Sequence, residues 1–317
     1  MKKSISILGS TGSIGQTALK IVDKRKNYFR IFMLSANKNY KLISQQINKY
    51  KPNIFVIYNT KIFLKLKKKY KNKKILILNS FNELNLNKKI DITISSIPGI
   101  VGLSPTILMT KYSRKILVAN KESIICGWNL INSTAKKNNT KIIPIDSEHF
   151  SILKLLENHS PNEIQKIFIT ASGGPFLNYD YKKLKKIKPK NALRHPKWKM
   201  GKKITIDSST LVNKIFELIE AQKLFNLSNK KIDILIHPNS LIHAIVCFKN
   251  GLTKLLYHET NMIIPIANAM LEKNLNIKEF YKNNEKFQKE KKINLIFKKI
   301  NNKIFPIIKL KNKINEY

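Results

Sequence analysis

The first 145 residues alternate short apolar runs with longer stretches in which apolar side chains recur at helical spacing. Short apolar runs bounded by turn residues predict buried strands, whereas helical recurrence predicts amphipathic helices. The expected strands cover residues 4–8, 29–36, 54–58, 75–78, 90–97, 115–119 and 142–145. Strands that alternate with helices in this way indicate a Rossmann-like, doubly wound parallel sheet in an α/β fold.

The pattern changes after residue 145. Apolar runs that predict strands now follow one another with less helix between them, at residues 164–170, 232–236, 243–248 and 253–257. They predict a second α/β domain with a mostly antiparallel sheet. The last part of the chain is rich in Lys and Asn and is typical of a linker. We therefore divide the chain into residues 1–145, 146–271 and 272–317.

The net charge of +41 would suit a nucleic-acid partner, but its distribution argues against one. The cations are nearly all Lys, are spread along the whole chain and accompany abundant Ile and Asn, a composition that A/T-rich codons explain. We expect no nucleic-acid partner, although the positive field would attract anionic small molecules.

Membrane and export signals are also missing from the sequence. No apolar run reaches the length of a membrane-spanning helix, and the N-terminus leads directly into a strand, which leaves no room for a cleavable signal. Cys126 and Cys247 are too few for a disulfide framework, so we expect two buried, inert thiols in a reducing, cytoplasmic setting.

Two segments, residues 144–149 and 207–217, carry the candidate chemistry. Asp146 and Glu148 are two residues apart after an apolar run, so in extended chain both carboxylates would point the same way. In the second segment, Asn213, Lys214 and Glu217 fall on one stripe of a predicted helix. Three carboxylates would form an oxygen site for Mg²⁺ or Mn²⁺, and the Ser, Asn and Lys side chains beside them suit a phosphate. The two segments predict metal-assisted chemistry on a small phosphorylated substrate.

A glycine turn after the first strand predicts a dinucleotide site. Gly9, Gly12 and Gly15 let the backbone approach a diphosphate at the start of a helix, although a plain strand–helix turn is the alternative. An NAD site would place an acid after the second strand, where this chain has Asn37, Lys38 and Asn39. A cation and two amides favour the 2′-phosphate of NADP, unless Lys38 is an ordinary surface residue.

Three histidines and one serine have alternative interpretations. His149 is either a fourth metal ligand or a hydrogen-bonding structural residue, and we favour the second. His237 and His243 resemble a zinc pair but lack a third ligand, which favours a structural role. Ser172 lies in a Ser-Gly-Gly loop without an accompanying His–Asp pair, so an anion-binding loop is favoured over a nucleophile.

As a set, the motifs resemble one family, 1-deoxy-D-xylulose 5-phosphate reductoisomerase. The matching segments, in the family's order, are residues 7–15, 119–123, 144–149, 172–176, 194–203, 213–217 and 237–243. The resemblance implies an NADPH-dependent and divalent-metal-dependent rearrangement and reduction of 1-deoxy-D-xylulose 5-phosphate to 2-C-methyl-D-erythritol 4-phosphate, in non-mevalonate isoprenoid biosynthesis. It also implies that the enzyme is both an oxidoreductase and an isomerase. The family further suggests a homodimer.

The same resemblance assigns roles to individual residues. The metal ligands would be Asp146, Glu148 and Glu217, and the catalytic residues Lys121, Glu148 and His195. The substrate would contact Lys121, Ser147, Glu148, Ser172, His195, Ser208, Asn213, Lys214 and Glu217. NADPH would contact Thr11, Gly12, Ser13, Ile14, Asn37, Lys38, Asn39, Asn120, Glu122 and Gly201. Residues 195–203 would form a closing loop in which Trp198 covers the substrate.

Two departures from the family pattern affect these expectations. Asn37 stands where family members usually have Gly. The family's C-terminal helical domain is truncated here, with at most its first helix at about residues 304–317, so 1–145 would be the NADPH-binding domain, 146–271 the catalytic and metal-binding domain, and 272–317 a linker and remnant. The alternatives are a different NADP-dependent, metal-requiring dehydrogenase, or a degenerate and inactive basic remnant.

Overall fold

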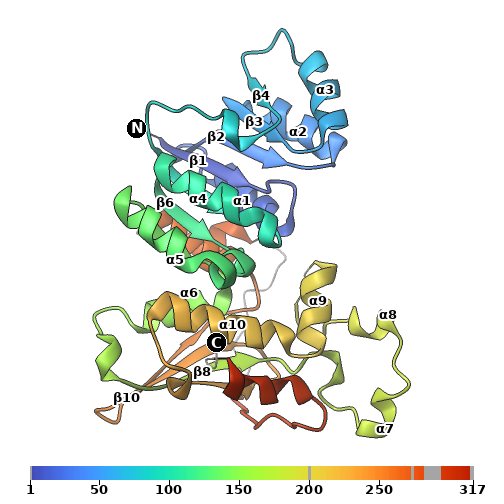
Figure 1. The fold of residues 1–317 in the computed structure, drawn as a ribbon, viewed down its shortest axis with the longest axis vertical. Helices are drawn as coiled ribbons and strands as arrows, with labels where there is room; N and C mark the ends of the chain where they lie inside the picture. The colour runs from blue at the N-terminus through green and yellow to red at the C-terminus, as the bar shows by residue number, and fades with distance from the viewer. Residues whose placement is uncertain (1, 199–200, 273–274, 282–293, 315–317) are drawn as a thin grey trace. The chain divides into compact units, whose positions relative to one another are not determined.

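The computed structural model describes residues 2–198, 201–272, 275–281 and 294–314. The chain forms two compact units, each described here by itself (Figure 1). Unit 1 holds residues 1–145 and a second stretch that begins at Pro265. Unit 2 holds Asp146–Ile264 and the described C-terminal residues.

Unit 1 is built on a seven-stranded sheet with the order β4-β3-β2-β1-β5-β6-β7. All of its neighbouring strands pair in parallel, which confirms the doubly wound parallel sheet. The strands are β1 (Lys3–Leu8), β2 (Phe29–Ala36), β3 (Ile54–Ile57), β4 (Leu76–Leu78), β5 (Ile90–Ser95), β6 (Ser113–Val118) and β7 (Lys141–Pro144). The order reverses at β1, between β2 and β5, which is where such sheets bind ligands at their carboxyl ends.

Helices connect these strands because their apolar residues recur at helical spacing. In α1 the buried side includes Gly15, Ala18, Leu19 and Val22. The helices of unit 1 are α1 (Ser13–Lys24), α2 (Tyr40–Tyr50), α3 (Thr60–Lys69), α4 (Leu103–Tyr112) and α5 (Lys121–Lys137), with 3₁₀ turns at Phe81–Glu83, Ile100–Gly102 and Ile277–Phe280.

Helix α11 (Ile263–Leu271) returns the chain to unit 1. The buried Lys115 on β6 donates from Nζ to the Ala269 carbonyl oxygen at 2.9 Å and pairs with Glu272 at 2.5 Å. Because these contacts tie residues from Pro265 onward to the first sheet, the boundary at residue 271 drawn from the sequence does not coincide with the division seen in the structure.

Unit 2 contains a four-stranded sheet of order β11-β10-β8-β9. The β8–β9 pair is parallel and the other two pairings are antiparallel, as the sequence pattern predicts. The strands are β8 (Ile164–Ala171), β9 (Ile232–Ile236), β10 (Ile242–Phe248) and β11 (Thr253–Tyr257). The helices are α6 (Ser147–Leu155), α7 (Tyr181–Leu184), α8 (Pro189–Ala192), α9 (Lys202–Ser209) and α10 (Val212–Phe225), with 3₁₀ turns at Pro161–Glu163, Gly174–Phe176 and Asn229–Lys231.

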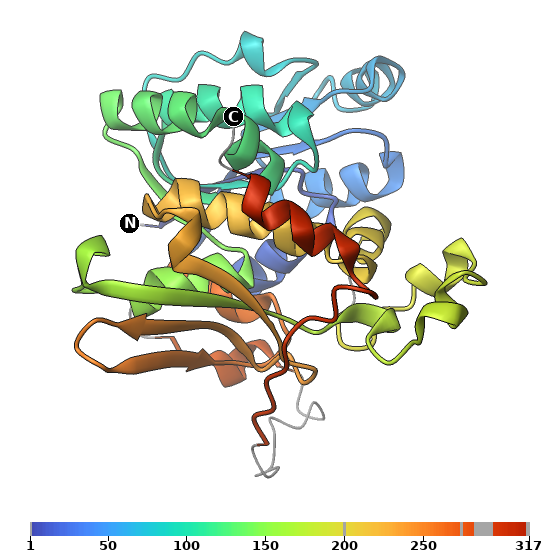
Figure 2. The same cartoon turned by 60° about the horizontal axis from the view of Figure 1, so that its bottom comes forward.

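Helices α6 and α10 cover this sheet and contact each other: α6 packs on β10 and β11, and α10 packs on β8 and β9 (Figure 2). Their apolar sides join the sheet in one core that includes Ile152, Leu218 and Ile167. The packing brings the amino ends of the candidate site's two helices into the same unit.

The C-terminal segment packs on unit 2 in a 3₁₀ helix, Pro306–Lys313, in place of most of the helix expected at residues 304–317. Phe305 is buried in the core, and Lys311 pairs with Asp233 at 2.5 Å. Residues 315–317 of the expected helix lie outside the described residues.

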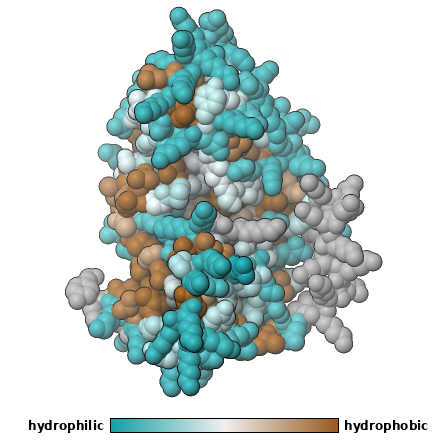
Figure 3. Space-filling model, turned by 90° about the vertical axis from the view of Figure 1, so that its right-hand side faces the viewer, coloured by the Kyte–Doolittle hydropathy of each residue, from teal (hydrophilic) through white to brown (hydrophobic). Residues whose placement is uncertain are grey.

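The surface mixes polar and apolar side chains, as the face in Figure 3 shows. Within the described part of the chain, no helix combines the length and apolarity needed to cross a membrane. The expectation of two buried thiols is wrong, because Cys126 is exposed on α5 and Cys247 is half-buried.

Candidate active site

The start of α6 carries the first half of the site. Strand β7 ends at Pro144, and Asp146 is the N-cap of α6, so Glu148 lies in the first helical turn. The expectation that Asp146 and Glu148 lie in extended chain is therefore wrong. An Asp followed by Ser and Glu is a strong helix-start signal, and it takes precedence over the apolar run before it.

The start of α10 carries the second half. Leu211 adopts a left-handed conformation (φ 63°), and this turn separates α9 from α10. In the first two turns of α10, Asn213, Lys214 and Glu217 are all buried. They lie on one stripe of the helix, at the spacing from which the sequence predicted it.

The three predicted ligands come together between these helix starts. Asp146, Glu148 and Glu217 each offer a carboxylate oxygen, and the three atoms lie within 4.8 Å of one another. The ammonium of Lys214 bridges two of the carboxylates, with 2.5 Å to Glu217 Oε2 and a shorter contact to Glu148 Oε1. The amide of Asn213 donates to Glu217 Oε1.

Charge compensation governs this cluster. Burial disfavours the charged form of Glu148, but the nearby Lys214 ammonium outweighs it and lowers the pKa of that carboxyl well below its ordinary value. Conversely, the two carboxylates raise the pKa of Lys214 despite its burial. Three carboxylates and one ammonium leave two negative charges, which a divalent cation would neutralise. The all-oxygen donor set therefore fits Mg²⁺ or Mn²⁺.

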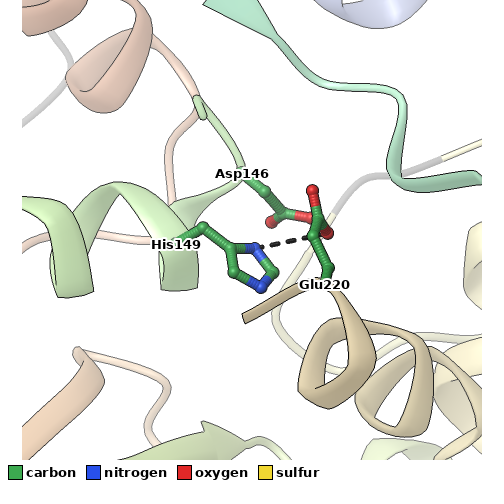
Figure 4. Close-up of side chains that lie close together, drawn as sticks. All are labelled: Asp146, His149 and Glu220. Carbon is green, nitrogen blue, oxygen red and sulfur yellow. Dashed lines mark ion pairs between the residues drawn. The ribbon is translucent and has the colours of Figure 1, made fainter. Parts of the chain in front are cut away.

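A second group lies behind the carboxylates and joins the two helices (Figure 4). His149 on α6 meets the Glu217 backbone oxygen on α10 through Nε2 at 2.8 Å, and its Nδ1 lies 3.4 Å from Glu220 Oε2. Asp146, His149 and Glu220 also form a cluster of potential ligands. Sequence reasoning missed Glu220, although its position three residues after Glu217 on one helix face could have found it.

Two of the candidate phosphate-binding residues, Ser172 and His195, meet at the loop after β8. Ser172 Oγ accepts the Gly174 N–H at 3.1 Å and lies 3.1 Å from His195 Nε2. Burial, reinforced by Lys214, lowers the pKa of His195 to about 4. His195 Nδ1 accepts backbone N–H groups, from Trp198 at 2.8 Å, so the neutral ring carries its proton on Nε2 and donates it to Ser172.

Ser147 and Ser208 are the remaining substrate candidates in unit 2. Ser147 donates from Oγ to Glu148 Oε2 at 2.6 Å, and Ser208 is half-buried in the last turn of α9. Gly201, a cofactor candidate, is the N-cap of α9. Of the expected closing loop, Lys199 and Met200 lie outside the described residues.

The glycine turn of unit 1 lies at the carboxyl end of β1. Gly9 has φ +84°, and a Cβ atom on Gly15 would lie 2.4 Å from the Gly9 carbonyl oxygen, so the helix start packs directly on the turn. Gly12 and Ser13 are exposed there, and Thr11 and Ile14 are half-buried. Open backbone at a helix start fits a dinucleotide diphosphate.

The expected 2′-phosphate residues follow β2 without an acid among them. Asn37, Lys38 and Asn39 are exposed, and Asn39 caps α2 by accepting the Leu42 N–H at 3.1 Å. An exposed cation between two amides fits the extra phosphate of NADPH.

The start of α5 holds the last candidates of unit 1. Asn120 caps the helix through Ser123 N–H at 2.8 Å and donates to the Gly99 carbonyl oxygen at 2.9 Å. Lys121 is buried, and Glu122 is half-buried beside it. The roles assigned to these residues stay predictions.

The remaining histidines have local partners. His237 stacks on Phe297 with ring centroids 4.9 Å apart, and His243 stacks on His258. Across the described residues, neither His237 nor His243 belongs to a cluster of three potential metal ligands. Their surroundings favour the structural interpretation over a zinc pair.

Known proteins resemble this chain along nearly its whole length. The model of the 1-deoxy-D-xylulose 5-phosphate reductoisomerase family matches residues 5–127, and that of the enzyme's C-terminal domain matches residues 142–225. The reductoisomerase of Pelagibacter ubique (strain HTCC1062) is 48% identical over 99% of this chain and 81% of its own length. That of Wolbachia pipientis wMel is 38% identical over 97% and 78%.

Solved structures agree with the sequence relatives. A crystal structure described as DOX-P reductoisomerase in complex with NADPH, fosmidomycin and magnesium has a TM-score of 0.87 and 31% identity, over 98% of this chain and 79% of that one. The enzyme from Zymomonas mobilis, in complex with NADPH, has a TM-score of 0.85 and 26% identity, over 99% and 81%. Two family models match in order and the relatives align along nearly all of this chain, so the chain belongs to the 1-deoxy-D-xylulose 5-phosphate reductoisomerase family.

Proposed function

We propose that the chain uses NADPH and a divalent cation to convert 1-deoxy-D-xylulose 5-phosphate into 2-C-methyl-D-erythritol 4-phosphate. The observation that carries the proposal is the convergence of Asp146, Glu148 and Glu217, with Lys214 between two of them. Related structures that contain magnesium, NADPH or both support the choice of cofactors.

In this proposal the carboxylates hold Mg²⁺ or Mn²⁺, which when bound supplies Lewis acidity toward the substrate's oxygen atoms. Glu148 lies at the proposed cation position and would be the group that moves a proton of a substrate hydroxyl there. The cation of Lys121 would contact the substrate hydroxyls and stabilise developing negative charge. NADPH bound at residues 11–14 and 37–39 supplies the hydride for the reduction.

The phosphate of the substrate would lie against Ser172, His195, Ser208, Asn213 and Lys214. His195 Nε2 donates to Ser172 Oγ, so the Ser172 hydroxyl hydrogen is left to donate to a phosphate oxygen without rebuilding the loop. A cation at the carboxylates would take over the charge balance that Lys214 now provides, which frees the ammonium for the phosphate. Excluding water with the loop that carries Trp198 would protect the aldehyde intermediate.

The family resemblance further suggests a homodimer in the cytoplasm. Sedimentation of the purified chain at several concentrations tests the dimer, which predicts twice the mass of 36.7 kDa. A concentration-independent monomer would contradict it.

NADPH oxidation with 1-deoxy-D-xylulose 5-phosphate, with Mg²⁺, with Mn²⁺ and with chelator, tests the function. We expect turnover that requires the cation and falls at least about a hundredfold in Glu148→Gln. Glu157→Gln is the matched control. Glu157 is an exposed acid that follows α6, and among the described residues its ion pair is with Lys154. Turnover that survives chelation, or that Glu148→Gln leaves intact, would refute the metal site.

A further inference from the structure

Three aromatic side chains of unit 2 form a column beside the carboxylates. The Trp198 ring meets His243 edge-on, with centroids 5.9 Å apart and an interplanar angle of 66°. His243 lies nearly parallel to His258, with centroids 3.9 Å apart and an angle of 19°. The edge-on arrangement of Trp198 and His243 is a favoured geometry for an aromatic pair. Both imidazoles are buried.

The sheet brings the two imidazoles together. Ile242 on β10 pairs with Tyr257 on β11, which makes His243 and His258 diagonal neighbours on one face of the antiparallel ladder. The His258 N–H donates to the Leu241 carbonyl oxygen at 3.0 Å and fixes the end of β11. The backbone that carries the His258 ring is therefore held by the sheet.

The hydrogen bonds of the two rings fix their planes. His243 Nε2 donates to the His258 backbone oxygen at 3.3 Å, and His258 Nδ1 donates to the Glu259 backbone oxygen at 2.8 Å. Within the described part of the chain, the buried His258 Nε2 has no hydrogen-bond partner. Burial lowers the pKa of both rings, which keeps the stacked pair neutral and without mutual repulsion. The side chains of His258 and His243 thus contact each other through the faces of their rings.

The column continues into the residues proposed to bind phosphate. The backbone N–H of Trp198 donates to His195 Nδ1 at 2.8 Å, and His195 Nε2 meets Ser172 Oγ at 3.1 Å. The stacking of His258 on His243 therefore limits where Trp198 can lie, and through Trp198 it limits the position of His195. A displacement of a substrate-covering side chain by about 1 Å is enough to change turnover substantially.

We propose that His258 is a positioning residue of this enzyme: by stacking on His243 it holds Trp198 over the substrate. The inference rests on the proposed function, because the substrate is the ketose phosphate of that reaction. His258 does not itself touch the reacting atoms in this proposal, and it acts through His243 alone.

Two substitutions separate the ring face from the hydrogen bond. His258→Phe keeps a flat ring and loses the donor to Glu259. His258→Asn keeps a side-chain N–H donor and loses the ring. Both are made in a Trp128→Phe parent, so that Trp198 is the single tryptophan of the chain. Trp198 fluorescence and its quenching by acrylamide then report the column without any need for activity.

We expect His258→Asn to expose Trp198 to acrylamide and to raise the KM for the ketose phosphate about three- to tenfold, the loss of one aromatic pair. The KM for NADPH should stay at the parent value, and His258→Phe should restore both readouts. In a Trp198→Leu background, His258→Asn should add little further, because the two residues act in one chain of contacts.

The proposal is overturned if His258→Asn leaves Trp198 quenching unchanged, if His258→Phe is as impaired as His258→Asn, or if the effects in the Trp198→Leu background are fully additive. Loss of folding in both His258 variants, seen by circular dichroism, would assign His258 a purely structural role and also overturn it. A parent that fails to oxidise NADPH with substrate would refute the proposed function instead, while the fluorescence comparison would still decide whether His258 supports Trp198.

Discussion

Replacing Lys214 by Met tests the charge balance at the core of the site. The Lys214 side chain is 9% exposed, and its partners Glu148 and Glu217 are 11% and 1% exposed. Met keeps the length and apolar stem of the side chain but leaves two buried carboxylates without their shared cation. Removing one partner of a buried ion pair costs about 3–5 kcal/mol of stability.

That loss converts into a measurable shift in melting temperature. For a domain of this size, about 2–4 °C accompany each kcal/mol, so metal-free Lys214→Met should melt about 6–20 °C below the parent protein. A divalent cation neutralises the same carboxylates, so Mg²⁺ should raise the melting temperature of the variant more than that of the parent. Cation binding at about a hundred times Kd contributes about 2.7 kcal/mol.

The assay is thermal unfolding followed by circular dichroism, first in chelator and then across a Mg²⁺ series. Lys154→Met is the matched control, because Lys154 pairs with Glu157 on the exposed surface at 2.6 Å and such pairs contribute about 0–1 kcal/mol. If metal-free Lys214→Met melts with the control, or if Mg²⁺ stabilises variant and parent equally, the assignment of Lys214 as the internal counterion is refuted.

Two further predictions concern pH and cofactor choice. Because the folded state lowers the Glu148 pKa from its ordinary 4.5 and raises that of Lys214 from 10.5, the pair's stabilisation should be complete between these values and decline on either side. Urea unfolding of metal-free protein across pH checks this; an alkaline decline that Lys214→Met leaves unchanged would contradict it. Lys38→Ala should weaken NADPH binding about tenfold and leave NADH binding unchanged, with Lys41→Ala on α2 as the control. A titration that shows the same NADPH-to-NADH ratio in Lys38→Ala and the parent would remove the 2′-phosphate argument.

The spacing of apolar and polar residues predicts the features that depend on residues close together in the sequence. The parallel sheet of unit 1 and the antiparallel pairings of unit 2 follow from the order of apolar runs. The stripe of Asn213, Lys214 and Glu217 follows from helical spacing. The same apolar run that predicts β7 wrongly predicts extended chain for Asp146 and Glu148, because the strand ends before the residue that caps α6.

Features that depend on long-range register were beyond sequence reasoning. His243 and His258 meet only because β10 and β11 pair with one particular register, with a bulge between Ile242 and Ile245. The contact of His149 with the Glu217 backbone oxygen depends on how α6 packs against α10. Neither spacing nor residue type encodes such contacts, because they are fixed by the packing of whole elements.

The return of α11 to the first sheet has a consequence for dissecting this protein. A fragment cut after Ile145 would lack the helix that Lys115 binds, and it would leave that lysine without the Ala269 oxygen and the Glu272 carboxylate. A fragment meant to reproduce unit 1 should therefore join Ile145 to the segment that begins at Pro265, so that it keeps the helix that Lys115 binds.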